Sequence, residues 1–248
     1  MGKLSGRIAV VTGGSRGMGR GIAELFGREG ADIAIIDLDQ KTGEGVAGGI
    51  RKIGRRGIAI RGDVGDEKDV TEAFARIASE LGAVDILVNN AGIDTTSEVA
   101  DMPTSMWDDM IRVNLRSIFL CTRAALPGML KKKHGRIINM ASQLAHKGAA
   151  EMAHYAAAKA GVIGFTRSLA YEVAAHGITV NAIAPGPIDT DLFRKLPEEW
   201  RKRKLAEIPM HRAGTVDEVA PTALLLASDE GAYYLGSTLN PNGGDVMV

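Results

Sequence analysis

A tyrosine and a lysine set four residues apart are the residues of this chain most suited to chemistry. Tyr155 and Lys159 stand in the stretch "HYAAAKAG", within a run that has the composition of a helix. Residues at this spacing on a helix project from one face. A phenol with a pKa of about 10 is a poor base at neutral pH, and a neighbouring ammonium favours its ionised form. The pair therefore predicts a phenol that exchanges a proton with a substrate alcohol, although the spacing alone is a frequent coincidence.

Two polar residues elsewhere in the chain strengthen this hypothesis. Ser142 ends the β-branched run "GRIINMAS". Its hydroxyl is placed either to donate a hydrogen bond to a substrate oxygen or to cap the next segment. Asn114 is a poor helix former inside the helical run "WDDMIRVNLRS". Its position predicts a local bend or a bound water.

A glycine-rich loop, "TGGSRGMG" at residues 12–19, follows the first β-branched run and opens a helix. Gly13, Gly17 and Gly19 permit a tight turn that brings helix-terminal N–H groups to a pyrophosphate. The spacing differs from the common G-x-G-x-x-G fingerprint, so tight packing of strand on helix is the alternative. Asp37 ends the second run, where a carboxylate binds the ribose hydroxyls of a dinucleotide or is simply solvated in a turn. Loop and aspartate together predict a dinucleotide site.

Two more strand ends carry residues that suit a dinucleotide. Asp63 and Val64 would flank an adenine, although "GDVGDEKD" also reads as an ordinary helix entry. In "NNAG" at residues 89–92, the asparagines can bond to neighbouring backbone while Gly92 leaves room for a cofactor. A plain turn is the alternative for this segment.

The elements that must position these residues alternate between strand and helix along the chain. Short β-branched runs separated by helix-length segments predict a single-domain, doubly wound parallel α/β sheet (Rossmann fold) over residues 1–248, with about seven strands and helices on both faces. Residues 187–215 are charged and partly helical, which suits a substrate lid or an ordinary surface hairpin. Ligands of such sheets bind outside the carboxyl ends of the strands. The predicted strands are residues 7–13, 31–37, 57–64, 84–92, 135–142, 177–186 and 237–244.

Composition excludes several other classes of function. Lys plus Arg and Asp plus Glu each total 30, so no overall field favours nucleic acid or an anionic membrane. The basic run "KKKHGR" is explained by lysines near a helix C-terminus. Cys121 is the only cysteine and is predicted to be a buried hydrophobe, and no secretory or membrane-spanning stretch is visible. These features predict a cytoplasmic location, with no nucleic-acid, membrane or metal site.

Taken together, these motifs with "PGPIDTD" resemble the short-chain dehydrogenase/reductase family from about residue 4 to the C-terminus. The resemblance implies that Tyr155 is the acid/base and that Lys159 lowers its pKa and binds the nicotinamide ribose. It also implies that Ser142 positions the substrate oxygen and that Asn114 holds a relay water. The predicted cofactor contacts are Gly13, Ser15, Arg16, Gly17, Met18, Gly19, Asp37, Leu38, Asp63, Val64, Asn90, Ala91, Gly92, Tyr155, Lys159, Pro185, Gly186, Ile188 and Thr190.

Within the family, "YAAAKAG" and "GITVNAIAPG" look most like 3-oxoacyl-acyl carrier protein reductases. Two departures weaken that assignment. Tyr171 stands where those reductases commonly carry an arginine that docks the carrier protein, and Lys133 remains as the other docking cation. Asp37 would repel the 2′-phosphate of NADP, against which Arg16 is the competing cation.

We therefore predict an NAD(H)-dependent oxidoreductase that interconverts a secondary alcohol and a ketone of a sugar, polyol, hydroxy acid or 3-oxoacyl substrate. NADP stays possible. The alternatives are an NADPH-dependent 3-oxoacyl-acyl carrier protein reductase and, less favoured, a non-catalytic dinucleotide-binding scaffold. Apolar residues on more than one side of the helical stretches 105–130 and 152–175, together with the resemblance, predict a homotetramer. Candidate pocket residues, each also explained by a core or helix-surface role, are Gln143, Leu144, Glu151, His154 and Phe193.

Overall fold

A computed structural model describes residues 2–248 of the chain. Its centre is a seven-stranded sheet with the order β3-β2-β1-β4-β5-β6-β7, in which every neighbouring pair is parallel. Each predicted range contains one strand, so the predicted doubly wound sheet is confirmed, although the last strand, predicted over 237–244, is only Thr238–Leu239. The strands are β1 (Ile8–Thr12), β2 (Asp32–Asp37), β3 (Gly57–Arg61), β4 (Ile86–Asn89), β5 (Gly135–Met140), β6 (Ile178–Ile183) and β7 (Thr238–Leu239).

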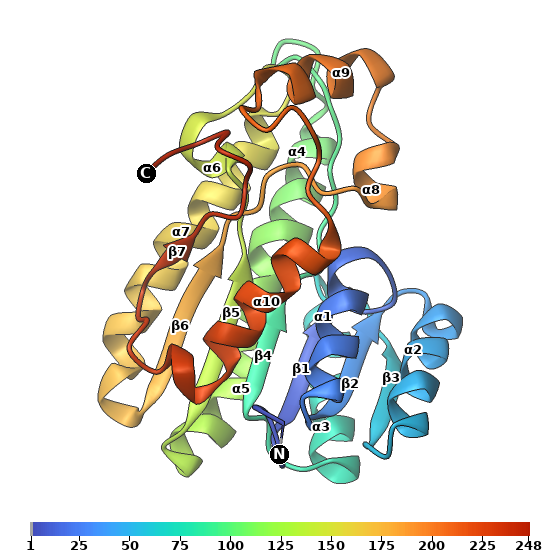
Figure 1. Cartoon of the computed structure of the whole chain (residues 1–248), viewed down its shortest axis with the longest axis vertical. Coiled ribbons are helices and arrows are strands. Elements are labelled where there is room, and N and C mark those ends of the chain that lie inside the picture. Colours follow the sequence, from blue (N-terminus) through green and yellow to red (C-terminus); the bar gives the residue numbers. More distant parts are fainter. Residues whose placement is uncertain (1) are drawn as a thin grey trace.

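Helices cover both faces of the sheet, as Figure 1 shows. Helices α1, α2 and α10 pack on one face and α3, α5 and α7 on the other. Alternate residues of the central strands supply the two cores because successive strand side chains point to opposite faces. The helices are α1 (Gly17–Arg28), α2 (Gln40–Lys52), α3 (Glu67–Glu80), α4 (Thr104–Ile111), α5 (Ser117–Lys132), α6 (Leu144–Lys147), α7 (Ala153–Val173), α8 (Asp191–Arg194), α9 (Glu198–Glu207) and α10 (Val216–Ala227).

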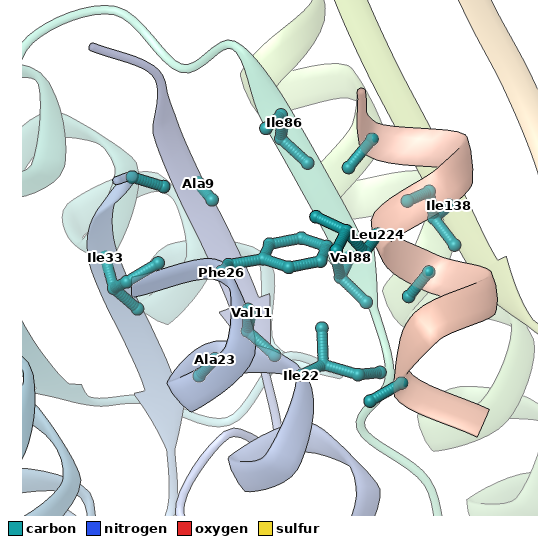
Figure 2. Packing of buried hydrophobic residues seen from close by; sticks show 14 of the residues in the cluster. Ala9, Val11, Ile22, Ala23, Phe26, Ile33, Ile86, Val88, Ile138 and Leu224 are labelled. Atoms are coloured by element: carbon teal, nitrogen blue, oxygen red, sulfur yellow. The ribbon is translucent and has the colours of Figure 1, made fainter. Parts of the chain in front are cut away.

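Phe26 of α1 lies at the centre of the first core. Figure 2 shows its ring lying over the sheet with Val88 and Ile86 of β4 nearby and Leu224 of α10 beside it. The side chain is fully buried, and replacing a buried phenylalanine with alanine typically costs about 3–5 kcal/mol. This packing fixes α1, and with it the glycine-rich loop at its start.

The strand order reverses between β1 and β4, so the loops that follow these strands diverge and leave a crevice at their carboxyl ends. Helices α8 and α9 lie above this end of the sheet in Figure 1. They belong to the segment 187–215, which is charged and partly helical as predicted.

A π-helical turn, Arg112–Arg116, joins α4 to α5 and has the buried Asn114 at its middle. The bend predicted at this asparagine is therefore present as a change of hydrogen-bonding pattern. Single π turns inside α-helices are frequent at functional sites.

Two further expectations concern ordinary structural roles. Cys121 is buried, and burial raises the pKa of its thiol to about 12. Lys132 of the basic run donates hydrogen bonds to Ala83 O and to Asp85 Oδ1, which is a local structural role. Across residues 2–248, none of the helices combines the length and apolar character that crossing a bilayer requires.

Candidate active site

Four polar side chains predicted to act together meet at the carboxyl end of the sheet. Lys159 of α7 is 4% exposed, and its Nζ donates a hydrogen bond of 2.7 Å to Met140 O at the end of β5. The same Nζ lies 5.7 Å from the centre of the Tyr155 ring. Ser142, also buried, lies two residues beyond β5, close enough to Tyr155 for a hydrogen bond to the phenol. Its Oγ donates to Gln143 Oε1 at 3.1 Å and accepts from Leu144 N at 3.2 Å, so it also caps the next segment. The predicted tyrosine, lysine and serine therefore form one group.

Gly92 brings the loop after β4 against this group. A Cβ atom at this position would lie 2.7 Å from Asn114 Oδ1 and 3.7 Å from Lys159 Nζ. A contact of 2.7 Å is too short for any side chain, so only glycine lets the backbone pass here. The backbone at Gly92 therefore lies between Asn114 and Lys159 and close to both.

The side-chain amide of Asn114 is hydrogen-bonded through its nitrogen but not through its oxygen. Its Nδ2 donates hydrogen bonds to Ile93 O at 3.0 Å and to Met110 O at 3.3 Å. Its Oδ1 is buried and accepts no hydrogen bond from residues 2–248. A buried acceptor of this kind has the chemistry to hold a water molecule.

The protein's own groups oppose ionisation of the phenol. Burial raises the pKa of Tyr155 above its usual value, the negative charge of Asp94 acts in the same direction, and the hydrogen bond with Ser142 opposes both. This is opposite in sign to the predicted effect of Lys159. The physical reason is desolvation, which also lowers the pKa of Lys159 to about 8 although Asp94 acts to raise it.

Asp94 is a site residue that the sequence analysis missed. It lies two positions beyond Gly92, and burial raises the pKa of its carboxyl to about 6 against the opposing effects of its own backbone amide, Lys159 and Lys195. A carboxylate in a loop has no periodic pattern to mark it. Its place just beyond the carboxyl end of β4, next to "NNAG", was the one available signal.

The glycine-rich loop combines the two roles that the sequence left open. Gly13 and Gly17 have left-handed backbone with φ of 62° and 55°, which glycine adopts at no steric cost. Gly19 packs so tightly that a Cβ would lie 2.2 Å from Gly13 O. Close packing therefore explains Gly19. Gly17 is the first residue of α1, and the N–H groups of this first helical turn have no partner within the helix, so they can bind a ligand in the crevice.

Asp37 organises the loop from the end of β2. Its Oδ2 accepts hydrogen bonds from Ser15 N at 3.1 Å and Ser15 Oγ at 2.6 Å, and its Oδ1 accepts one from Asp39 N at 3.0 Å. Arg16 does not swing free, because it pairs with Asp39. Asp37 is followed by Leu38, which is 63% exposed.

The remaining predicted contacts occupy the same edge of the sheet. Asp63 forms an ion pair of 2.7 Å with Arg112 and accepts a hydrogen bond from Gly65 N, so its carboxylate has a structural role. Asn90 Nδ2 donates to Thr12 O and Gly13 O, as expected for an asparagine that holds neighbouring backbone. The backbone N–H of Ala91 donates to Thr12 Oγ1. Val64 is buried in the second core.

The segment "PGPIDT" is tied to its surroundings through its backbone. Pro185 O accepts a hydrogen bond from Gln143 N, and Gly186 N donates to Pro241 O. Ile188 pairs with Gly214 in an isolated β-bridge. Thr190 Oγ1 accepts from Phe193 N and so caps α8. Residues 186–190 thus form one wall of the site.

A cavity of about 90 Å³ lies against Ser142 and Tyr155. It includes three of the candidate pocket residues, Gln143, Leu144 and Phe193. Glu151 and His154 do not line it: His154 is fully buried and hydrogen-bonded to Thr95, and Glu151 O accepts from Ser97 N. The complete lining is Met18, Asp94, Ser142, Gln143, Leu144, Met152, Tyr155, Gly186, Pro187, Ile188, Thr190, Leu192, Phe193, Leu196 and Trp200.

The architecture and the site define a class of protein. An all-parallel sheet with a glycine-rich loop after β1 has the form of a dinucleotide-binding domain. A buried serine, lysine and asparagine and a half-buried tyrosine converge beside it. Nothing within residues 2–248 groups three side chains that could hold a metal ion. The geometry fits a dinucleotide-linked oxidoreductase.

Comparison with known proteins identifies the family. A family profile described as enoyl-(acyl carrier protein) reductase matches residues 13–245. The 3-oxoacyl-[acyl-carrier-protein] reductases FabG of Vibrio harveyi and Escherichia coli (strain K12) are each 45% identical over 246 residues, 99% of both chains. The FabG of Staphylococcus aureus (strain Mu50) is 41% identical over 242 residues, 97% of this chain and 98% of its own. The chain belongs to the short-chain dehydrogenase/reductase family and is an NAD(P)-dependent oxidoreductase acting on alcohol or keto groups.

Proposed function

We propose that the protein reduces 3-oxoacyl thioesters to 3-hydroxyacyl thioesters, with NADH as the preferred reductant. The observation that carries this proposal is the apolar cavity wall facing Ser142 and Tyr155, which suits an acyl chain better than a sugar. The similarity to FabG proteins over the whole chain supports the same substrate class. It favours the 3-oxoacyl alternative over the broader range of alcohols first predicted. The apolar residues of the wall are Met18, Leu144, Met152, Ile188, Leu192, Phe193, Leu196 and Trp200.

The residues present fit a nicotinamide dinucleotide. The α1 N-terminus at Gly17 suits the pyrophosphate, Asp37 and the exposed Leu38 suit the adenosine end, and Lys159 suits the nicotinamide ribose. Residues 186–190 and Gly92 leave the nicotinamide its place beside Tyr155. When bound, the dinucleotide carries the hydride and, in its oxidised form, brings a positive charge to this end of the site.

The proton chemistry rests on Tyr155. The ketone carbon gains a hydride, the electron pair of its C=O bond moves to oxygen, and that oxygen takes the phenol proton. Ser142 donates a hydrogen bond to the same oxygen as its charge develops. Asn114 Oδ1 holds a water through which the phenol regains its proton. A raised pKa keeps the phenol protonated at neutral pH, which suits the reductive direction.

The preference for NADH rests on two carboxylates. Asp37 and Asp39 lie side by side at the end of β2, and Asp39 already pairs with Arg16. A 2′-phosphate would meet like charge, and Arg16 is already engaged by Asp39. At about 4 Å and an effective dielectric near 20, a unit pair repels by about 4 kcal/mol before screening.

Only one of the two cations expected to dock an acyl carrier protein is present. Lys133 is an exposed cation, but Tyr171 presents a neutral ring, 91% exposed, in place of the second docking cation. We therefore expect small thioesters and coenzyme A thioesters to be reduced, with at most about a tenfold advantage for an acyl carrier protein thioester.

A panel of substrates tests the function. Purified protein is assayed with the acetoacetyl thioesters of N-acetylcysteamine, coenzyme A and acyl carrier protein, and in reverse with polyols and aldoses, each with both dinucleotides. Thioester reduction with NADH, at a kcat/KM well above that of any polyol, is expected. Rapid oxidation of a polyol without thioester reduction would overturn the proposal.

A further inference from the structure

Asp94 is held in position from both sides by the catalytic elements. The carbonyl of the preceding residue, Ile93, accepts the hydrogen bond of 3.0 Å from Asn114 Nδ2. The hydroxyl of the following residue, Thr95, is hydrogen-bonded to His154 Nε2 at 2.8 Å. His154 is fully buried and immediately precedes Tyr155. The backbone of Asp94 is therefore fixed relative to the phenol.

The carboxylate of Asp94 borders the cavity that contains Ser142 and Tyr155. Within residues 2–248 no side chain donates a hydrogen bond to it. Asp94 is also the one carboxylate among the lining residues, and no lysine, arginine or histidine is among them. The fixed charge on the cavity wall is therefore negative.

The nearby cations do not provide a partner for an anionic substrate. Lys159 Nζ is bound to Met140 O and has Asp94 as its neighbouring counter-charge. Lys195 is exposed to solvent on the segment between α8 and α9, where its charge is screened. A carboxylate next to the reacting ketone would meet Asp94 without the arginine or lysine that recognition of carboxylates requires.

We propose that Asp94 is a specificity-determining residue that excludes substrates bearing a carboxylate one methylene group away from the reacting carbon and admits their neutral esters and thioesters. On this assignment a 3-oxo acid becomes a substrate only when its acid group is masked. The inference deepens the proposed function, and it holds for any ketone that the same cavity binds. It argues against the hydroxy acids considered from the sequence.

A pair of ligands compared across variants tests the charge. Acetoacetate and ethyl acetoacetate share the 3-oxobutanoyl group, but the acid carries a negative charge where the ester carries a neutral ethyl group, and this difference in size is the same in every variant. Their kcat/KM values are compared in wild type, in Asp94→Asn, which keeps the shape of the side chain, and in Asp101→Asn. Asp101 is exposed nearby on the same loop, so its variant removes an equal charge away from the cavity.

The expected result is a strong preference for the ester in wild type and in Asp101→Asn. In Asp94→Asn the ester-to-acid ratio should fall about tenfold or more, because like charges placed together in a partly buried site are costly. Any effect of Asp94 on Lys159 or Tyr155 changes kcat/KM for both compounds alike and therefore cancels in this ratio. An unchanged ratio in Asp94→Asn, or an equal fall in Asp101→Asn, would overturn the assignment.

Binding measurements separate this inference from the proposed function. Dissociation constants of the two compounds for the enzyme–NADH and enzyme–NADPH complexes are measured by dinucleotide fluorescence and give the same ratio without turnover. A protein that reduces no thioester but shows the Asp94-dependent ratio would refute the function and retain the inference. Thioester reduction combined with an ester-to-acid ratio that does not depend on Asp94 would support the proposed function and refute the inference. If Asp94→Asn does not fold, Asp94→Ser supplies the neutral side chain.

Discussion

The phenol of Tyr155 is surrounded by groups that oppose its ionisation. Burial and Asp94 raise its pKa, and Lys159, itself desolvated, is held by a backbone carbonyl. The residue is therefore better prepared to give a proton than to take one. We infer that the reverse, oxidative direction depends on the positive charge that an oxidised cofactor adds to the site.

Replacing Tyr155 with phenylalanine removes the proton donor and keeps the ring. Turnover should fall by about 10²- to 10⁴-fold, the usual contribution of acid/base catalysis, with dinucleotide affinity preserved. Steady-state kinetics and fluorescence titration with NADH measure the two effects. Tyr171→Phe, on the same helix but exposed, is the matched control and should behave as wild type. Activity near wild type in Tyr155→Phe would refute the assigned role.

The charge of Lys159 should make cofactor affinity depend on pH. Its pKa is lowered to about 8, so the ammonium is present below this pH and is lost as the pH rises through it. The NADH dissociation constant should increase between pH 7 and 9, roughly across the transition. Lys159→Met should bind weakly and lack this dependence. A flat profile in wild type would show that the lysine stays charged.

Cofactor choice depends on two neighbouring aspartates. Asp37→Ala releases Ser15 as well as removing a charge, so NADH binding should weaken and the predicted preference of about tenfold or more should narrow. Asp39 still repels a phosphate and neutralises Arg16 in that variant. Combining Asp37→Ala with Asp39→Ala removes both carboxylates and releases Arg16, so this double variant should favour NADPH. Comparison of kcat/KM with both dinucleotides measures this, and a wild type that prefers NADPH would contradict it.

The segment with α8 and α9 closes a cavity smaller than its proposed substrate needs. The cavity is about 90 Å³, whereas ligand sites usually measure about 300 Å³ or more. Trp200 and Leu196 of this segment pack against Leu144 and Met152. We therefore retain the proposal that residues 187–215 form a lid that must move for a substrate to enter.

A buried ion pair ties α9 to the C-terminal segment and to α6. Lys204 of α9 lies 2.6 Å from Asp245, which also pairs with Lys147 of α6 at 2.8 Å, and Lys204 and Asp245 are almost fully buried. Removing one partner of a buried pair commonly costs about 3–5 kcal/mol, here less because Lys147 remains.

Lys204→Met should therefore speed hydrogen exchange in residues 191–207 while the central strands keep their protection. Lys202→Met, which removes a lysine from the exposed face of the same helix, should leave exchange unchanged. Equal exchange in both variants would show that the pair does not restrain the lid. Mass spectrometry of peptic fragments makes the comparison.

The sequence predicts the elements well and the contacts between them poorly. Most strands are β-branched runs with a glycine, aspartate or asparagine at or soon after their ends, so their type and place follow from local pattern. The pairing of Asp63 with Arg112 joins residues far apart in sequence, which no local pattern predicts. His154 is a wrong pocket candidate because the pattern locates α7 but not the direction in which its side chains point, and Glu151 lies in the turn before α7, where no periodicity applies. Asp94 lies in a loop, where no periodicity marks the residues that face a site.

At the scale of the whole molecule, most of the apolar residues of α5 and α7 that were expected to contact another subunit are instead buried in the core of their own chain. Ile118, Leu120, Val162 and Ile163 are buried, so only part of the predicted apolar excess on α5 and α7 is available. Phe119 is 44% exposed and carries Arg123 over its ring at 4.9 Å. The exposed aromatic surface continues elsewhere with Tyr171, Tyr233 and Tyr234.

We still expect a homotetramer, with Phe119 inside a subunit interface. A stable interface buries about 800 Å² per partner, and a charge placed at its centre is strongly unfavourable. Phe119→Glu should therefore lower the mass measured by light scattering at micromolar concentration. Ile53→Glu introduces the same charge at a similarly exposed position, 50%, at the end of α2 next to the edge strand β3, and should leave the mass unchanged. A monomeric wild type would refute the assembly, and an unchanged mass in Phe119→Glu would place the interface on another face.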